Sequence, residues 1–239
     1  MNAVYINRDW TKMKIAVIPA RGGSKRILRK NIKRFHGKPM IAYSIEAALA
    51  SGCFDEVCVS TDDTDIANVA LRYGAAIPFI RPADLADDYA TTLDVMTHAL
   101  NWYKQNNNAI THVCCIYATA PFITPETLQS GLAALKSADL DYAFSATNYA
   151  FPIQRALKIT SQNTVEMFQP EHLSTRSQDL EEAYHDAGQF YWGTVDAFIN
   201  RKPFFSPRAK AVLLPRKYVQ DIDTQEDWEL AEALFKVLK

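Results

Sequence analysis

The sequence lacks the features that would place this 239-residue chain in a membrane or outside the cell. No apolar run approaches the roughly 20 residues that a membrane-spanning helix needs. The first twelve residues, MNAVYINRDWTK, contain no hydrophobic signal-peptide core. We therefore expect a cytoplasmic protein with no membrane partner. Because Met13 stands immediately before the first apolar run, residues 1–12 are interpreted as an extension of one domain that covers residues 13–239.

An excess of charge of one sign is also missing. The chain has 26 Lys and Arg against 27 Asp and Glu, a net charge of -1. Proteins that grip nucleic acid need a strong basic excess, so no nucleic-acid partner is expected. The four cysteines form no CxxC pair, which argues against a zinc site and predicts buried, reduced thiols.

What the sequence does contain is an alternation of short apolar runs with amphipathic helical patterns. This alternation predicts an α/β fold with a doubly wound, Rossmann-like, mostly parallel sheet. In such sheets ligands bind at the carboxyl ends of the strands. Strands are expected at residues 14–19, 57–60, 77–80, 113–117, 142–146, 188–192 and 212–214, with a final helix that Thr224 and Asp227 cap.

The pattern breaks from about residue 147. Residues 147–187 are polar and irregular at first, and rich in Gln, Thr, Ser and Arg. They are interpreted either as a small insertion that serves as a dimerisation element or as a long surface excursion.

A basic loop follows the first predicted strand. Five cations fall within ten residues, and the neighbouring Gly22 and Gly23 favour a tight turn with amide groups directed at a ligand. Neither a Walker A sequence nor a GxGxxG fingerprint is present. Because the loop lies where a parallel sheet binds ligands, it predicts a polyphosphate site. The cations are Arg21, Lys25, Arg26, Arg29 and Lys30.

Two carboxylates stand two residues apart near the end of the chain. In extended backbone Asp221 and Asp223 point the same way, while Ile222 points into the core. Mg²⁺ is typically held by one or two carboxylates together with phosphate oxygens and water. The pair therefore predicts a Mg²⁺ site opposite the basic loop.

An ordered set of motifs from about Met13 to the C-terminus resembles the CMP-sialic acid synthetase family, whose members are cytidylyltransferases for nine-carbon 2-keto sugar acids. The resemblance implies a nucleotide-diphospho-sugar transferase type of fold and a homodimer. The motifs are residues 18–25 (IPARGGSK), 30–31 (KN), 37–40 (GKPM), 59–62 (VSTD), 81–82 (RP) and 221–224 (DIDT).

Two further segments, 185–192 (HDAGQFYW) and 117–122 (YATAPF), resemble the branch of that family acting on pseudaminic acid. Tyr117 stands where enzymes for sialic acid have Gln. The resemblance implies that CTP and pseudaminic acid give CMP-pseudaminic acid and pyrophosphate, which would serve surface-glycan or flagellin glycosylation. The alternatives are the same reaction on N-acetylneuraminic, legionaminic or an eight-carbon keto acid, a dinucleotide-dependent oxidoreductase, and a catalytically silent nucleotide-binding module.

The resemblance also implies roles for individual residues. Those expected to be catalytic are Arg21, Lys25 and Asp223. The expected nucleotide contacts are Ala20, Arg21, Gly22, Gly23, Ser24, Lys25, Lys30, Asn31, Arg81 and Thr92. The expected Mg²⁺ ligands are Asp221 and Asp223. The expected sugar contacts are Tyr117, Gln189, Tyr191 and Arg176, the last from a partner subunit's insertion. His185 is either a base or a hydrogen-bonded structural histidine.

Overall fold

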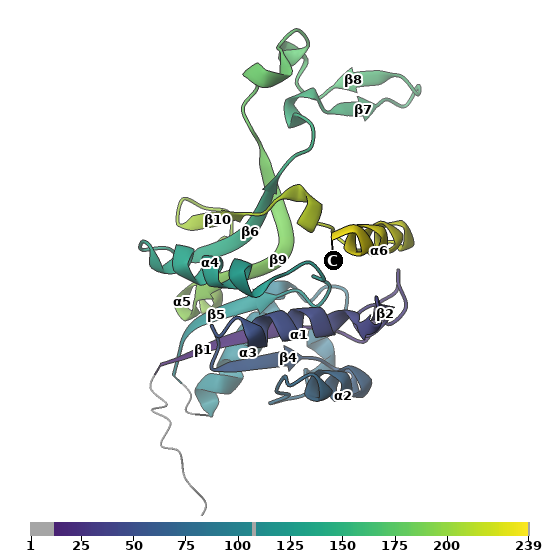
Figure 1. Ribbon diagram of the computed structural model, residues 1–239. Coiled ribbons are helices and arrows are strands. Elements are labelled where there is room, and N and C mark those ends of the chain that lie inside the picture. The colour runs from purple at the N-terminus through teal and green to yellow at the C-terminus, as the bar shows by residue number, and fades with distance from the viewer. Residues whose placement is uncertain (1–11, 107–108, 239) are drawn as a thin grey trace, which may run out of the picture.

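A single six-stranded sheet forms the centre of the protein in the computed structural model, which describes residues 12–106 and 109–238 (Figure 1). Except for Lys12, the expected extension at residues 1–12 lies outside this described part. The strand order is β10-β6-β9-β5-β1-β4. The strands are β1 (Met13–Pro19), β4 (Glu56–Ser60), β5 (Ile110–Ile116), β6 (Tyr142–Asn148), β9 (Tyr184–Thr194) and β10 (Ala209–Leu213).

The sheet is mostly parallel and doubly wound, as the sequence predicts. Strand β1 pairs in parallel with β4 on one side and with β5 on the other. Within this sheet only β9 runs antiparallel to its neighbours, β5 and β6. The chain therefore reverses its winding direction at β1, which places a ligand-binding crevice at the carboxyl ends of β1 and β5.

Helices cover both faces of the sheet. The side chains of β1 alternate between two hydrophobic clusters, with Ile18 packed under α1, α2 and α4, and Val17 under α3 and α5. Among the described residues, no helix has the length and apolar character needed to cross a bilayer. The helices are α1 (Met40–Ala50), α2 (Thr64–Arg72), α3 (Thr92–Gln105), α4 (Pro125–Lys136) and α5 (Val195–Ile199).

The last helix, α6 (Gln225–Leu238), builds a third cluster beside the sheet. Its predicted cap is confirmed, because the Asp227 amide donates to Thr224 Oγ1 at 3.2 Å and the Thr224 amide donates to Asp227 Oδ2 at 2.8 Å. Trp228 packs on Phe35, and the fully buried Ile222 belongs to the same cluster. Phe35 lies in the short hairpin of β2 (Arg34–Phe35) and β3 (Lys38–Pro39).

One predicted strand is wrong. Residues 77–80 do not join the sheet, and next to them Cys58 and Ala76 make an isolated parallel bridge. Pro78 has no amide hydrogen to donate to a ladder, which limits pairing at this point. The chain instead runs past the end of β4, where the Arg81 amide donates to the Thr61 carbonyl at 2.8 Å.

An arm, residues 149–183, leaves the sheet between β6 and β9 and projects away from the domain (Figure 1). The β6–β9 ladder continues to the pair Asn148 and Tyr184, so the arm is shorter than the expected insertion of 147–187. It contains a hairpin of β7 (Leu157–Ile159) and β8 (Val165–Met167) and the short 3-10 helices Ile153–Arg155, Pro170–His172 and Ser177–Asp179.

Candidate active site

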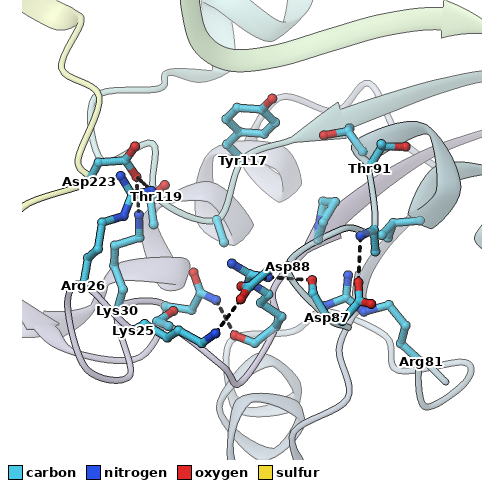
Figure 2. A pocket seen from close by; sticks show the side chains of 18 of the residues that line it. Lys25, Arg26, Lys30, Arg81, Asp87, Asp88, Thr91, Tyr117, Thr119 and Asp223 are labelled. Carbon is cyan, nitrogen blue, oxygen red and sulfur yellow. Dashed lines mark hydrogen bonds and ion pairs between the residues drawn. The ribbon is translucent and has the colours of Figure 1, made fainter. Parts of the chain in front are cut away.

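A cavity of about 330 Å³ opens at the carboxyl ends of β1 and β5 (Figure 2). Its walls come from residues 19–31 after β1, residues 81–92 before and at the start of α3, residues 117–119 after β5, and Asp223 before α6. Four segments that are far apart in sequence therefore meet at the rim that the strand pattern predicts. The predicted site residues that line the cavity are Arg21, Ser24, Lys25, Lys30, Asn31, Arg81, Thr92, Tyr117 and Asp223.

The basic loop, residues 20–31, bends close to the end of β4. A Cβ atom at Gly22 would lie 2.8 Å from Asp63 Oδ2, so this position has no room for a side chain. The Gly22 amide donates to Asp62 Oδ1 at 3.0 Å. Gly22 and Gly23 both keep negative φ angles, so the close approach to Asp63, rather than a left-handed turn, accounts for the glycine at position 22.

Arg21 and Lys25 converge on one carboxylate in the middle of the site, as Figure 2 shows for Lys25. Arg21 Nη1 lies 2.9 Å from Asp88 Oδ1, and Lys25 Nζ lies 2.5 Å from Asp88 Oδ2. Arg21 also donates to the Asp87 carbonyl at 2.6 Å. The hydrogen bond from Lys25 and the two positive charges lower the pKa of Asp88. The Asp88 carboxylate thus lies between two cations at the centre of the cavity.

A second group of cations surrounds Asp223 at another side of the cavity (Figure 2). Arg26 Nη2 lies 3.0 Å and Lys30 Nζ lies 3.2 Å from Asp223 Oδ1. Lys30 also donates to the Ile222 carbonyl at 2.5 Å, which ties the basic loop to the segment before α6. The basic loop and Asp223 therefore face the same space.

Asn31 and Arg81 hold the loops around the cavity in place. Arg81 also keeps a hydrogen-bond donor without a partner among the described residues. Asn31 Nδ2 donates to the Arg21 carbonyl at 2.9 Å, so it fixes the loop as well as lining the cavity. Arg81 is 4% exposed, and burial lowers the pKa of its guanidinium. Within the described part of the chain its Nε has no hydrogen-bond partner, and its Nη2 lies 3.7 Å from Asp62 Oδ1, an ion pair that is too long for a hydrogen bond. A buried guanidinium with open donors suits an acceptor group on a ligand.

Asp221 and Asp223 are the carboxylates of this region with the chemistry to bind a divalent cation. The described residues contain no group of three or more His, Cys, Asp or Glu side chains that could hold a metal. Loss of hydration around Asp221 and the charge of Asp223 raise the pKa of Asp221, which a nearby cation would offset. Asp223 lines the cavity, whereas Asp221 does not, so only one of the two predicted carboxylates faces the space where a cation could arrive with a nucleotide.

Several predicted residues lie outside the cavity wall. Ala20, Gly22 and Gly23 belong to the basic loop behind it. Tyr191 donates to Asp186 beneath the cavity, and Gln189 Nε2 donates to the Tyr218 carbonyl at 2.7 Å. Arg176 pairs with Asp179 at 2.7 Å within the arm, so the structure does not bring it to the site of its own chain.

The contacts of His185 are those of a structural histidine. Its Nδ1 lies 2.8 Å from the Asp186 carbonyl oxygen, and its ring lies against Tyr149 with centroids 4.8 Å apart. The side chain does not line the cavity. These contacts favour the second of the two interpretations of this residue.

Sequence reasoning missed part of the cavity wall. Arg26 was recognised as one of the clustered cations, but its pairing with Asp223 was not predicted. The acidic run that follows Arg81 was a signal for Asp87 and Asp88, but their position between Arg21 and Lys25 depends on contacts across more than 60 residues. The other cavity residues missed in this way include Leu85, Ala90, Thr91, Val95, Ala118 and Thr119.

A family model described as cytidylyltransferase matches residues 15–238. The chain belongs to the cytidylyltransferase family. Its clustered cations and the facing carboxylate agree with nucleotidyl transfer, in which positioning and charge neutralisation dominate. The membership excludes the dinucleotide-dependent oxidoreductase alternative. The cysteines agree with the prediction of buried thiols, because Cys53, Cys58, Cys114 and Cys115 are all buried and free.

Two individual relatives show which members of the family this chain is similar to. Pseudaminic acid cytidylyltransferase of Campylobacter jejuni is 48% identical over 223 residues, which are 93% of this chain and 96% of the relative. CMP-N,N'-diacetyllegionaminic acid synthase of Legionella pneumophila is 34% identical over 227 residues, 93% of this chain and 96% of the relative. The resemblance to CMP-sialic acid synthetases is confirmed by these matches.

The fold is shared with more distant enzymes. The solved structure of CMP:2-keto-3-deoxy-manno-octonic acid synthetase complexed with CTP has a TM-score of 0.66 and is 18% identical, covering 94% of this chain and 98% of that one. At this identity the likeness concerns the fold alone. It confirms the Rossmann-like nucleotidyltransferase fold expected from the strand and helix pattern.

The Asp88 pairing makes a testable prediction about this cytidylyltransferase. Asp88→Asn removes the carboxylate that occupies Arg21 and Lys25, so CTP no longer has to displace it. Both ion pairs are exposed and therefore individually weak, so we expect the Kd for CTP to fall by about two- to fivefold. Isothermal titration calorimetry measures this change. Asp84→Asn on the same loop is the matched control and should leave the Kd unaltered, whereas unchanged or weaker binding by Asp88→Asn would contradict the prediction.

Proposed function

We propose that the protein transfers the cytidylyl group of CTP to pseudaminic acid, giving CMP-pseudaminic acid and pyrophosphate. The observation that carries the proposal is a cavity where the basic loop and Asp223 face each other, in a chain 48% identical to a pseudaminic acid cytidylyltransferase. The product would be an activated sugar for glycan or flagellin modification. Relatives named for other acids, such as the legionaminic acid enzyme, are less similar at 34% identity.

The proposed roles follow from the charges around the cavity. Arg21 and Lys25 exchange Asp88 for the β- and γ-phosphates and neutralise the charge that develops as pyrophosphate leaves. Lys30 and Arg81 bind the nucleotide through their ammonium group and open guanidinium donors, and the basic loop and Thr92 complete this side of the site. Removing one such cation from a preorganised site typically costs on the order of 100-fold in rate.

The reaction itself is an in-line displacement. The anomeric hydroxyl oxygen of the sugar forms a bond to the α-phosphorus, and the bond from that phosphorus to the pyrophosphate oxygen breaks. The hydroxyl proton passes to a base, and we assign this role to Asp223 Oδ2 in the cavity wall, because Arg26 and Lys30 contact the other oxygen, Oδ1. Lys30 and Arg26 hold the Asp223 carboxylate in position.

We assign Asp221 and Asp223 as the ligands of Mg²⁺. When bound, the cation would spread the negative charge of the triphosphate during the reaction. Burial of Ile222 supports the assignment, because it fixes the backbone on which both carboxylates are carried.

Of the proposed sugar contacts on the β5 and β9 side, Tyr117 lines the cavity, whereas Tyr191 and Gln189 are buried outside its wall. Tyr191 lies directly behind Tyr117, with the two ring centroids 6.1 Å apart. Gln189 Oε1 is buried and has no hydrogen-bond partner among the described residues, which leaves it open for a donor. Arg176 can contribute only from a second subunit, because in its own chain it lies in the arm.

A nucleotide and sugar panel tests the function. The purified protein is supplied with each of the four common nucleoside triphosphates and, in turn, pseudaminic, legionaminic, N-acetylneuraminic and an eight-carbon keto acid. We expect Mg²⁺-dependent pyrophosphate release with CTP, and the largest kcat/KM with pseudaminic acid. No release with any sugar would sink the catalytic proposal and favour a silent nucleotide-binding module, while a preference for another acid would correct the substrate.

The metal assignment makes a separate prediction. Asp221→Asn and Asp223→Asn are each expected to lower kcat/KM by about 100-fold, and Asp221→Asn should need more Mg²⁺ for half-maximal rate because one ligand is weakened. The measurement is a Mg²⁺ titration of pyrophosphate release. Glu229→Gln, at an exposed position of α6, serves as the control. Full activity of a variant that carries both substitutions would show that neither residue binds the metal.

We further propose that the arm holds a homodimer together. It exposes apolar side chains that a second copy would cover, since Phe151 is 83% and Leu173 is 73% exposed. Changing both to Ser should convert a dimer into a monomer in sedimentation velocity and lower kcat/KM for the sugar, since Arg176 would no longer reach the partner's site. Thr160→Ala in the same arm is the control. A wild-type monomer at micromolar concentration would refute the dimer.

A further inference from the structure

The short helix α5 ends in a turn that usually contains glycine. The Arg201 amide donates to the Phe198 carbonyl at 3.2 Å, and the Lys202 amide donates to the Ala197 carbonyl at 2.9 Å. These two bonds form a Schellman motif, in which the residue after the helix cap is left-handed and is most often glycine. Here that residue is Arg201, with a φ of 52°. Because a side chain strains the backbone in this conformation, the contacts of the Arg201 side chain indicate why it is there.

The Arg201 side chain reaches the start of α3. Its Nη1 donates to Asp94 Oδ1 at 2.6 Å, a contact between residues 107 positions apart in the sequence. The Arg201 side chain is 50% exposed and that of Asp94 is 29% exposed. This ion pair therefore joins the turn after α5 to the first turn of α3.

Asp94 also caps α3. Its Oδ2 accepts from the Thr91 amide at 2.8 Å and from the Thr91 hydroxyl at 2.6 Å, and the Asp94 amide donates to Thr91 Oγ1 at 3.2 Å. Hydrogen bonds from Thr91 and Arg201 lower the pKa of Asp94 to about 2, so the carboxylate is charged at neutral pH. Oδ2 is occupied by Thr91 and Oδ1 by Arg201, so both oxygens hold the carboxylate in one orientation.

A capping box of this kind needs only one of the two carboxylate oxygens. In the box that begins α6, both the amide and the hydroxyl of Thr224 donate to the same atom, Asp227 Oδ2. The box of α3 likewise uses Asp94 Oδ2 alone, which leaves Oδ1 for Arg201. The contact with Arg201 is therefore not required to begin the helix. Its effect is to fix the Asp94 carboxylate and, through it, Thr91.

The residues fixed in this way belong to the cavity wall. Thr91 and Thr92 line the cavity, and Figure 2 shows Thr91 at its edge. The loop 82–91, which carries Asp88, ends at this cap. The Thr91 hydroxyl donates to Asp94 Oδ2 and accepts from the Asp94 amide, so its orientation is set before a ligand arrives. A wall that is already ordered does not have to be ordered at the expense of binding free energy.

We propose that Arg201 is a positioning residue that fixes the α3 side of the cavity for CTP. The inference rests on the proposed function, in which Thr92 lies on the nucleotide side of the site. Arg201 does not line the cavity itself and acts through Asp94 and Thr91. The proposed sugar contact Tyr117 lies at the end of β5, so the loss of Arg201 affects CTP more than the sugar.

Replacement of Arg201 by glycine separates this role from stability. Arg201→Gly removes the contact with Asp94 but supplies the residue that the Schellman turn favours, so we expect the Tm to stay the same or to rise. Because the lost ion pair is exposed and therefore weak, the KM for CTP should rise about two- to fivefold. The kcat and the KM for the sugar should change little. Arg201→Lys keeps a cation near Asp94 and should restore most of the KM for CTP.

Pyrophosphate release with each substrate varied in turn measures the two KM values. The control is Glu46→Gln, which removes an ion pair of the same length, 2.6 Å from Lys38 Nζ, outside the cavity wall and should alter neither KM. The proposal is overturned if Arg201→Gly leaves the KM for CTP unchanged, or if it raises both KM values equally. A lower Tm with unchanged KM values, or no improvement of Arg201→Lys over Arg201→Gly, would also overturn it.

A direct CTP titration by calorimetry, without sugar, distinguishes this proposal from the proposed function. If the wild type binds CTP but releases no pyrophosphate with any sugar, the proposed function fails, and the Kd for CTP of Arg201→Gly still decides the role of Arg201. An active wild type with an unchanged Kd in Arg201→Gly rejects the role of Arg201 alone. A wild type that does not bind CTP rejects both.

Discussion

Repulsion among the cations of the basic loop is the constraint on which the rest of the site depends. Five positive side chains within ten residues cannot lie together at a sheet edge unless anions are supplied from elsewhere. The fold supplies them from three directions, and one of these is the pair Asp63 and Asp65 beside Arg29. Asp88 neutralises Arg21 and Lys25 at the centre, and Asp223 neutralises Arg26 and Lys30 at the side.

Asp88 and Asp223 are placed by different means, and this difference matters for their roles. Asp223 follows the fully buried Ile222, so the hydrophobic cluster under α6 determines its position. Asp88 lies on an exposed loop with about half of its side chain accessible, and it can move away at little cost. Under the proposed function, a triphosphate would replace Asp88, while Asp223 would stay at the rim.

Much of this arrangement could be predicted from sequence because it depends on local patterns. The apolar β1, the cations that follow it, and the Thr224 cap with Ile222 between two aspartates were all readable within short windows. The contacts that could not be predicted join distant segments. The space beside Gly22 is filled by Asp63, which follows the end of another strand. Residues 77–80 have the composition of a strand, but Pro78 has no amide hydrogen to donate to a neighbouring strand. Arg176 looked suited to a sugar carboxylate, yet its surroundings depend on the path of the arm.

The position of Ile222 has a consequence for the order in which the enzyme becomes active during its synthesis. The basic loop and the strands under the cavity are translated first, and the carboxylates on either side of Ile222 follow more than 190 residues after Lys30. A nascent chain can therefore complete most of its sheet while the cavity still lacks this wall. Because α6 must pack before Ile222 is buried, this wall of the active site forms only after the basic loop and the strands under the cavity have been translated.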